Sequence, residues 1–320
     1  MKSDSKIYIA GHRGLVGSSI HRELQRKGYT NFALRARTEL DLTRADDVAK
    51  FFAEERPEYV FLAAAKVGGI LANNEMPGDF IRENLAIQMS VLEAARATGV
   101  RRLLFLGSSC IYPKLCPQPI REEYLLTGPL ELTNRPYAIA KIAGIEMCWA
   151  YNRQFGTKFL AAMPTNLFGP GENFDLRTSH VLAALLRKVI EAKASGASTI
   201  TVWGSGTPRR EFLYSDDLAQ ACVFLMNLPD AKYDSLLRED EPPLLNVGTG
   251  EDLTIRELAA AICKVVGFEG ELEFDPSKPD GTPRKLLDVS RIQALGWRAQ
   301  TSLEDGLRIL AKDFKARLKL

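Results

Sequence analysis

The stretch that decides the fold is GHRGLVG, residues 11–17, which follows the apolar run KIYIA at residues 6–10. We expect the apolar run to be a strand. The next segment, residues 15–28, is expected to be a helix because Leu15, Ile20 and Leu24 recur at helical spacing. Glycines let a backbone turn tightly against a pyrophosphate, and the amino terminus of a helix offers N–H groups and a positive dipole end to the anion. A glycine triplet alone is a weak signal, but its place between the first strand and the first helix predicts a dinucleotide-binding loop.

Outward from this loop, strand-like and helix-like segments alternate. We expect strands at residues 31–37, 59–65, 101–107 and 158–163, and helices from a cap at Thr43 to about Glu55, at 80–99 and over roughly 135–155. Such alternation is typical of an α/β fold with a doubly wound, Rossmann-type parallel sheet. After residues 163–174, Gly and Pro cluster and the strands become short. We therefore expect a cofactor-binding domain over residues 1–170, to which 212–250 returns, and a smaller α/β substrate-binding domain formed by 171–211 and 251–320.

Composition narrows the function classes. The formal net charge of +2 gives no indication of a nucleic-acid partner. No stretch approaches the roughly 20 apolar residues of a membrane helix, and the first residues lack the apolar region of a signal peptide. The five cysteines are odd in number, scattered and without metal-binding spacing. We expect reduced thiols, a cytoplasmic protein and no metal site.

The choice of cofactor depends on the end of the second expected strand. An Asp or Glu there would bind the ribose 2′-hydroxyl of NAD, but this chain has Arg35-Ala36-Arg37. Guanidinium groups bind a 2′-phosphate through bidentate, charge-assisted hydrogen bonds, so NADP(H) is favoured. Because the two arginines alternate across a strand, we expect Arg37, with Arg13 from the loop, to contact the cofactor. The alternative is that Arg35 and Arg37 are solvated surface charges.

Tyr137 and Lys141 form the second signal. Residues four apart share a helix face, and an ammonium one turn from a phenol lowers the phenol pKa from about 10. Such a tyrosine can donate a proton to a developing alkoxide near neutral pH. Ser108, at the end of the strand expected at 101–107, would hydrogen-bond the same oxygen. Tyr-x-x-x-Lys alone also fits a solvated helix face, but the three residues together behind a glycine loop are much more specific.

With these motifs in place, nearly the whole chain resembles the extended short-chain dehydrogenase/reductase superfamily, whose phosphate loop has glycines spaced by three. Six segments are similar to one family within it, the bifunctional 3,5-epimerase/4-reductases of GDP-4-keto-6-deoxy-D-mannose: GHRGLVG, AAAKVGGILANN (63–74), LGSSCIYPK (106–114), PYAIAKIAGIE (136–146), MPTNLFGP (163–170) and KPDGTPRKLLDVSR (278–291). The resemblance implies a GDP-sugar substrate that is converted to GDP-L-fucose, NADP(H) as the cofactor, and a homodimer.

The resemblance also implies roles for Cys110 and His180. A ketone at C4 acidifies the hydrogens at C3 and C5, and inversion there needs a base on one face and an acid on the other. Cys110 is implied as the base and His180 as the acid, while Tyr137 and Ser108 hydrogen-bond the enolate oxygen. If the chain stays extended past residue 107, residues 108 and 110 project to the same side, and a nearby cation would make the thiol a useful base. The alternative for Cys110 is a small buried structural residue, as we expect for Cys148 and Cys222.

Further contacts follow from the same resemblance. The implied cofactor contacts are Gly11, His12, Arg13, Gly14, Leu15, Val16, Gly17, Arg37, Asp41, Leu42, Lys141, Pro164, Asn166, Leu167 and His180. The implied substrate contacts are Lys188, Trp203, Arg210 and Asp280. An arginine fork suits a diphosphate, and Arg210 is preferred to Arg209. Trp203 would otherwise be a core aromatic and Lys188 a solvated charge.

Two features bear on the acid and on rival functions. Ser179 is expected to cap the helix that follows His180, and residues 174–179 read FDLRTS, where the family has His-Pro after the Phe. The rival enzyme is another nucleotide-sugar 4-epimerase or 4-reductase, although a 4-epimerase usually retains NAD and the paired arginines count against it. The rival from another class is a non-catalytic NADP(H)-sensing protein, which would not need Ser108, Tyr137 and Lys141.

Overall fold

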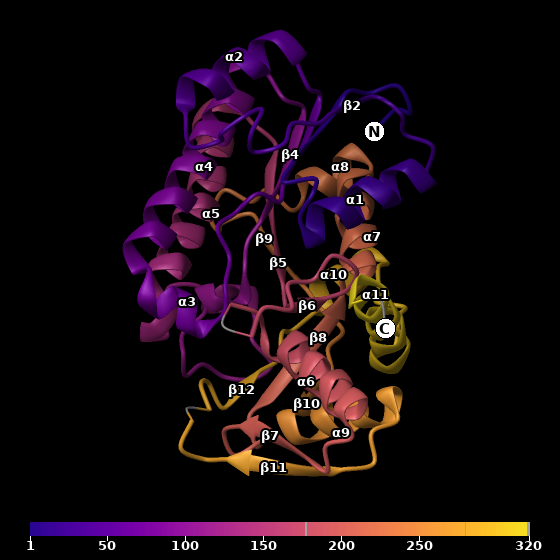
Figure 1. Cartoon of the computed structure of the whole chain (residues 1–320). Coiled ribbons are helices and arrows are strands. Elements are labelled where there is room, and N and C mark those ends of the chain that lie inside the picture. The colour runs from indigo at the N-terminus through magenta and orange to yellow at the C-terminus, as the bar shows by residue number, and fades with distance from the viewer. Residues whose placement is uncertain (177, 279, 319–320) are drawn as a thin grey trace.

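A sheet of six parallel strands forms the larger lobe of the computed structural model, which describes residues 1–176, 178–278 and 280–318 (Figure 1). The strand order is β2 (Phe32–Ala33), β1 (Ile7–Ala10), β3 (Tyr59–Leu62), β4 (Arg102–Leu106), β5 (Phe159–Pro164) and β9 (Leu244–Val247). Most of these strands are buried along their whole length, as expected for a parallel sheet with helices on both faces. Of the segment 212–250 that was expected to return to this domain, residues 244–247 join the sheet as β9, which pairs with β5.

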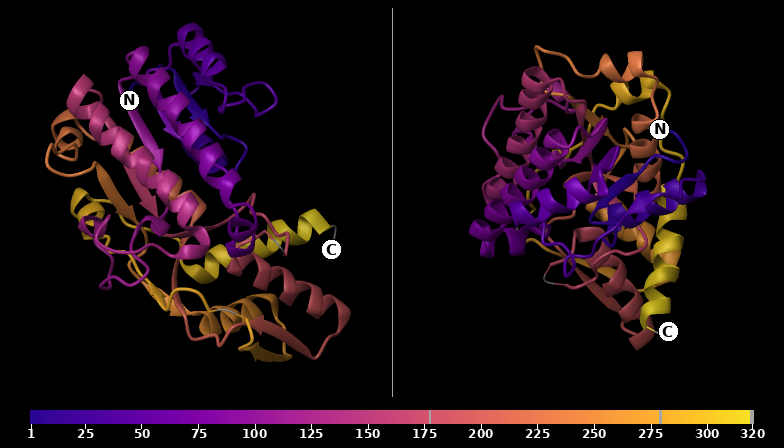
Figure 2. Two further views of the ribbon diagram at one scale, coloured as in Figure 1. Left: turned by 90° about the vertical axis from the view of Figure 1, so that its left-hand side faces the viewer. Right: turned by 90° about the horizontal axis from the view of Figure 1, so that it is seen from above.

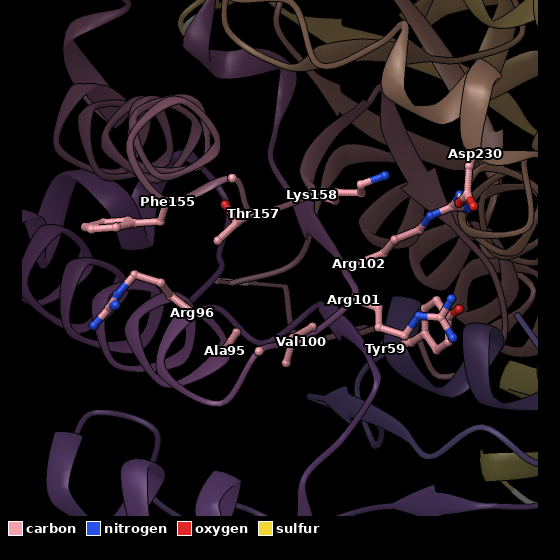
Figure 3. Close-up of a pocket in the computed structure, with 12 residues that line it drawn as sticks. Tyr59, Ala95, Arg96, Val100, Arg101, Arg102, Phe155, Thr157, Lys158 and Asp230 are labelled. Atoms are coloured by element: carbon pink, nitrogen blue, oxygen red, sulfur yellow. The ribbon is translucent and has the colours of Figure 1, made fainter.

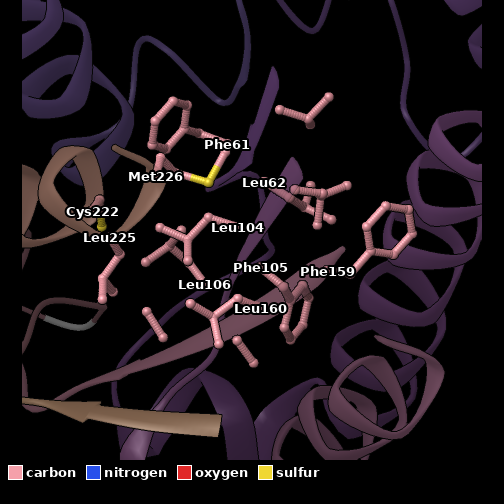
Figure 4. Packing of buried hydrophobic residues seen from close by; sticks show 14 of the residues in the cluster. Phe61, Leu62, Leu104, Phe105, Leu106, Phe159, Leu160, Cys222, Leu225 and Met226 are labelled. Atoms are coloured by element: carbon pink, nitrogen blue, oxygen red, sulfur yellow. The ribbon is translucent and has the colours of Figure 1, made fainter. Parts of the chain in front are cut away.

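Helices cover both faces of the sheet (Figures 1 and 2). One face carries α2 (Ala45–Glu55), α4 (Pro77–Ala97) and α5 (Arg135–Phe155), and the other carries α1 (Leu15–Arg26), α7 (Ser215–Met226) and α8 (Asp230–Asp234). Phe61, Leu104 and Leu160 of the central strands are fully buried between these layers, with Cys222 and Met226 of α7 packed beside them (Figure 4). Cys148 and Cys222 are both 0% exposed, so the prediction that they are small core residues is confirmed.

The smaller lobe lies below the large sheet in Figure 1. Its strands are β6 (Asn166–Phe168), β7 (Thr199–Trp203), β8 (Arg209–Tyr214), β10 (Asp252–Thr254), β11 (Glu271–Asp275) and β12 (Arg284–Lys285). β8 pairs with β6, β10 and β12, while β11 pairs with β7. A second buried cluster joins α6 (Val181–Ser195), α9 (Ile255–Val266) and α11 (Leu303–Leu318). The short helices α3 (Ile70–Glu75) and α10 (Ser290–Leu295) complete the chain.

Two local expectations are wrong. The second strand covers only residues 32–33 instead of 31–37, since pairing with β1 stops at Ala33; Arg35 beyond it donates to the Glu55 carboxylate. Thr43 does not cap the following helix: Arg44 is its N-cap, and the Thr43 amide and hydroxyl both donate to Asp41 Oδ1 at 3.0 and 2.8 Å. In the described part of the chain, no helix combines the length and apolar character needed to cross a bilayer.

Candidate active site

The carboxyl ends of the parallel strands converge where the two lobes meet. β2 lies on one side of β1, whereas β3, β4, β5 and β9 follow on the other, so the strand order reverses between β1 and β3. Open α/β sheets bind ligands outside the carboxyl ends of the strands at such a reversal. The glycine loop follows β1, Ser108 follows β4 and Asn166 follows β5, so the fold brings these three predicted segments to one edge.

The glycine loop forms a backbone cradle that side chains would fill. Gly11 has φ +84°, and a Cβ there would lie 2.9 Å from the backbone of Ala64. A Cβ on Gly17 would lie 2.2 Å from the Gly11 carbonyl oxygen. Gly14 is the N-cap of α1 and offers no side chain to the first-turn N–H groups, and the buried His12 Nδ1 has no hydrogen-bond partner. These observations fit a dinucleotide pyrophosphate.

The arginines near the expected adenosine site differ in how free their guanidinium groups are to bind a phosphate. Arg35 is 2.6 Å from the Glu55 carboxylate and its guanidinium lies 5.2 Å from the Phe51 ring centroid. By contrast, the Arg37 side chain is 77% exposed, with Glu83 3.4 Å away, and Arg13 is exposed. The geometry therefore favours Arg37 over Arg35 for a 2′-phosphate. The alternation expected between them is wrong, because β2 ends at Ala33 and residues two apart on a strand would share one face.

Asp41 and Leu42 were also predicted as cofactor contacts. The Asp41 carboxylate accepts two hydrogen bonds from Thr43, which hold its pKa below the usual range. Leu42 is partly buried and packs against the core of the larger lobe. Their contact with a cofactor stays a prediction, as do those of the buried Pro164 and of Leu167.

Lys141 and Tyr137 share one face of α5 at the end of β4. The Lys141 Nζ is buried, donates to the Leu106 carbonyl at 2.7 Å and lies 5.9 Å from the Tyr137 ring centroid. Burial lowers the pKa of Lys141 to about 8. Burial raises the pKa of Tyr137, with Cys110 acting in the same direction and a hydrogen bond with Ser108 opposing it. The expected lowering of the Tyr137 pKa by Lys141 is wrong for this state, because desolvation of the phenol dominates and the ammonium is engaged by a carbonyl.

Cys110 lies beside the same hydroxyl groups, although the chain does not stay extended as predicted. Residues 109–111 form the 3-10 turn η1 (Ser109–Ile111), which places the Cys110 thiol beside the Ser108 side chain. The thiol is 7% exposed and burial raises its pKa, while Lys285, Ser108 and Lys141 oppose the shift in that order. Cys110 therefore stands next to the proposed oxygen site and is not turned away into the core.

His180 is the N-cap of α6, so the prediction that Ser179 caps this helix is wrong. The Ser179 hydroxyl is buried without a hydrogen-bond partner. Before His180, the Thr178 carbonyl accepts from the Gly69 amide at 2.9 Å, which ties this loop to the segment after β3. The His180 side chain stays accessible, and the surrounding protein together with Lys285 lowers its pKa. Arg177 of the FDLRTS stretch lies outside the described residues.

The predicted substrate residues line up along β7, β8 and α6. Trp203 is 58% exposed, which excludes a core aromatic, and Lys188 Nζ lies 5.1 Å from its ring centroid. Arg209 is held by Asp252 at 2.9 Å, which leaves Arg210 as the available guanidinium of the pair. Burial lowers the pKa of Arg210, and Asp280 opposes this.

Two further predicted contacts already have hydrogen-bond partners. The Asp280 carboxylate accepts from the Ser205 amide and hydroxyl, both at 2.8 Å, and so shapes the loop after β7. The Asn166 amide donates to the Glu211 carbonyl at 2.8 Å. Lys285 was missed by sequence reasoning: it lies inside the KPDGTPRKLLDVSR segment, and nothing but its three-dimensional neighbours distinguishes it from a surface lysine.

A cavity of about 570 Å³ lies at the amino-terminal edge of the sheet, away from the predicted site residues (Figure 3). Its cations already have partners: Arg102 is 2.6 Å from Asp230, and Lys158 is 2.7 Å from Asp234. We therefore do not assign the cofactor or the substrate to this cavity. In the described ranges, no group of three or more His, Cys, Asp or Glu side chains could hold a metal ion.

Comparison with known proteins defines the class. Residues 7–237 match the model of the NAD dependent epimerase/dehydratase family, and the chain belongs to this family. The chain is 57% identical over 303 residues to GDP-L-fucose synthase 1 of Arabidopsis thaliana, covering 95% of this chain and 91% of the relative. Within the broader class, it therefore belongs to the family of the GDP-L-fucose synthases.

Two solved structures resemble the fold over the whole chain. A GDP-6-OMe-4-keto-L-xylo-heptose reductase from C. jejuni is 40% identical, with a TM-score of 0.92 and 99% of both chains covered. A GDP-L-fucose synthetase from Naegleria fowleri bound to NADP is 26% identical, with a TM-score of 0.87, and covers 100% of this chain and 96% of its own.

Proposed function

We propose that this protein is an NADPH-dependent 3,5-epimerase/4-reductase that converts GDP-4-keto-6-deoxy-D-mannose to GDP-L-fucose. One observation carries the proposal: the Cys110 thiol, a candidate base, and Tyr137, a candidate acid, both lie beside Ser108 and close to the buried Lys141. A simple reductase needs the hydroxyl groups and the lysine but not the thiol. The 57% identity to a plant GDP-L-fucose synthase supports the same substrate.

NADPH would supply the hydride for the reduction when bound. The cradle of residues 11–17 would hold its pyrophosphate, and Arg13 and Arg37 its 2′-phosphate. Of the other predicted contacts, His12, Leu15 and Val16 follow β1, and Asn166 and Leu167 follow β5. Residues 1–170 with 212–250 would form the cofactor-binding domain, and 171–211 with 251–320 the substrate-binding domain.

In each epimerisation, the Cys110 thiolate removes the proton from C3 or C5. The electron pair of that C–H bond forms a double bond to C4, and the π pair of the C4 carbonyl moves onto the oxygen. Tyr137 and Ser108 donate hydrogen bonds to the resulting enolate oxygen. His180 would return a proton to the carbon on the other face, and the ketone re-forms. The configuration at that carbon is then inverted, with no net change in protons on the substrate.

In the reduction, the same oxygen accepts a proton from Tyr137 as the carbonyl carbon gains a hydride. Burial keeps Tyr137 in the protonated form at neutral pH, which is the form that can donate. The Lys141 ammonium stabilises the phenolate that remains, and Ser108 holds the oxygen in place. One oxygen site therefore serves both kinds of chemistry.

The GDP end of the substrate would bind the smaller lobe. Arg210 is placed for the diphosphate, and the exposed Trp203, flanked by Lys188 and Lys278, offers an apolar face with cations beside it. Asp280 would act through the Ser205 loop that it holds.

A homodimer and a cytoplasmic location belong to the same proposal. The dimer would form through α4 and α5, where Met89, Ile139 and Phe155 are 55%, 42% and 45% exposed. Met89→Glu should halve the mass measured by light scattering. All five cysteines are free, which suits a reducing compartment.

The test is to mix the protein with NADPH and GDP-4-keto-6-deoxy-D-mannose and to follow absorbance at 340 nm. Oxidation of NADPH, with GDP-L-fucose as the product and solvent deuterium at C3 and C5 in D₂O, is the expected result. Oxidation without deuterium would mean a simple 4-reductase, the activity that the C. jejuni likeness favours as the alternative. Cofactor binding without oxidation would mean a non-catalytic NADP(H) sensor.

A further inference from the structure

Lys285 lies where the smaller lobe meets the catalytic turn. It belongs to β12, which pairs with β8 so that Lys285 stands opposite Arg210. Lys285 and Cys110 line the same small cavity, together with Glu131 and Asn134 from the segment before α5. A strand of the smaller lobe thus brings a cation to the thiol of the larger lobe.

The charge of Lys285 is not neutralised by a close carboxylate. Within the described part of the chain, Lys285 has no ion pair, whereas its cavity neighbour Lys114 is 2.7 Å from Glu131. The adjacent Arg284 contacts Asp252 at 2.5 Å. Burial lowers the pKa of Lys285, and of the groups around it Cys110, Glu131 and Cys116 raise it while Arg210 lowers it. The Lys285 ammonium is therefore poorly solvated, and of the groups around it the Cys110 thiol affects its pKa most.

Lys285 in turn lowers the pKa of the Cys110 thiol. The groups that act on Cys110 from the elements around it are Lys285 of β12, Ser108 before η1, and Lys141 of α5. Lys285 opposes the burial of the thiol more than the other two do. Lys141 is engaged by the Leu106 carbonyl, and Ser108 is shared with Tyr137. Lys285 is thus the cation best placed to favour the thiolate.

We propose that Lys285 is a positioning residue that promotes formation of the Cys110 thiolate, the base of epimerisation, and plays no part in the reduction. This inference rests on the proposed function and deepens it by naming the group that activates the base. The same ammonium acts on His180 and disfavours the imidazolium, which makes His180 a stronger proton donor once it is protonated. The Lys285 charge, on a strand of the smaller lobe, therefore lowers the pKa of both the proposed base and the proposed acid.

The first experiment needs no substrate. In a Cys116→Ser background, the rate of Cys110 alkylation by iodoacetamide is measured against pH, with the label located by mass spectrometry. Lys285→Met should slow alkylation at pH 7.5 by about tenfold or more and move the profile to higher pH, because the thiolate loses the cation that favours it most. Lys285→Arg should restore the rate to within about threefold of the parent, since it keeps the charge. Lys114→Met, in the same cavity but paired with Glu131, is the matched control and should leave the profile in place.

The second experiment separates activation from binding. With GDP-4-keto-6-deoxy-D-mannose in D₂O, Lys285→Met should slow deuterium entry at C3 and C5 about tenfold, while NADPH oxidation by an already epimerised intermediate stays near the parent rate. NADPH binding and thermal unfolding report whether the variant is folded, and Lys285→Gln provides a second neutral variant.

An unchanged alkylation profile in both folded neutral variants overturns the inference. A raised KM for the nucleotide sugar with an unchanged profile also overturns it, since Lys285 would then only bind substrate. If the parent protein shows neither deuterium exchange nor NADPH oxidation, the proposed function fails, and the alkylation profile still tests Lys285 on its own.

Discussion

The two halves of the proposed catalytic cleft are built in different ways. The residues proposed for reduction, Ser108, Tyr137 and Lys141, come from the end of β4 and a single turn of α5, both within the larger lobe. The residues proposed for epimerisation, Cys110, His180 and Lys285, come from a 3-10 turn, a helix N-cap and an edge strand of the smaller lobe. These two sets are called the reducing half and the epimerising half. Regular hydrogen bonding holds the first set in place, whereas the second requires the two lobes to pack correctly.

This difference implies that the two activities can be separated. Changes at the lobe boundary should impair epimerisation before reduction, because they move Lys285 and His180 while leaving β4 and α5 intact. A protein of this family could in principle lose the epimerising half and remain a reductase.

The largest effect is expected from Tyr137→Phe. Reduction should fall by about 10³-fold, because the proton donor to the C4 oxygen is lost and Ser108 alone remains. Deuterium exchange at C3 and C5 should fall less, since an enolate oxygen still has the Ser108 hydrogen bond. Single-turnover NADPH oxidation and NMR of exchange in D₂O measure the two rates. Equal losses in both would contradict the separation of the two halves.

Cys110→Ser should act on the opposite half. Exchange at C3 and C5 should fall by about 10²-fold or more, because a serine hydroxyl is a far weaker base than a thiolate at neutral pH. Reduction of an already epimerised intermediate should stay substantial. Cys148→Ser, at a fully buried site in α5, tests whether the loss is local to the cleft or follows from any thiol removal. Undiminished exchange in the Cys110 variant would exclude Cys110 as the base.

Arg37→Ala should raise the KM for NADPH by about tenfold and leave the KM for NADH unchanged, because a charge-assisted hydrogen bond to the 2′-phosphate is lost. Arg35→Ala is the matched control: its guanidinium is engaged by Glu55, so the preference for NADPH should stay. A change of preference in the Arg35 variant alone would reverse the assignment. Steady-state kinetics with both cofactors decides between the two arginines.

A smaller effect is expected from pH, which should change the rates of reduction and of deuterium exchange in opposite directions. The pKa of Lys141 is lowered by burial to about 8, so its ammonium is present below that pH and is lost above it. Between pH 7 and 8 the reduction rate should fall by about half. Exchange should rise over the same interval, because the pKa of Cys110 is raised by burial and more thiolate forms as the pH increases. Parallel pH profiles for the two rates would contradict the assignment of separate titrating groups.

Local sequence predicted the reducing half almost completely. The glycine cradle, the Tyr137–Lys141 spacing and the strand ending at Leu106 each depend on hydrogen bonding between near neighbours in the chain, and all three are found where they were expected. The early end of the second strand was missed because strand propensity does not say how far the chain stays paired with its neighbour, which here is only to Ala33.

The sequence by itself determined the sheet, the phosphate loop and the helix face that carries Tyr137 and Lys141, because these follow from periodicities of two and 3.6 residues and from the backbone freedom of glycine. Only the tertiary structure decided that Ser108 turns to Cys110 through a 3-10 turn, that desolvation raises the Tyr137 pKa, and that Lys285 reaches the thiol. Desolvation and Coulomb interactions depend on distances between atoms far apart in the chain, and no local pattern of residues encodes those distances.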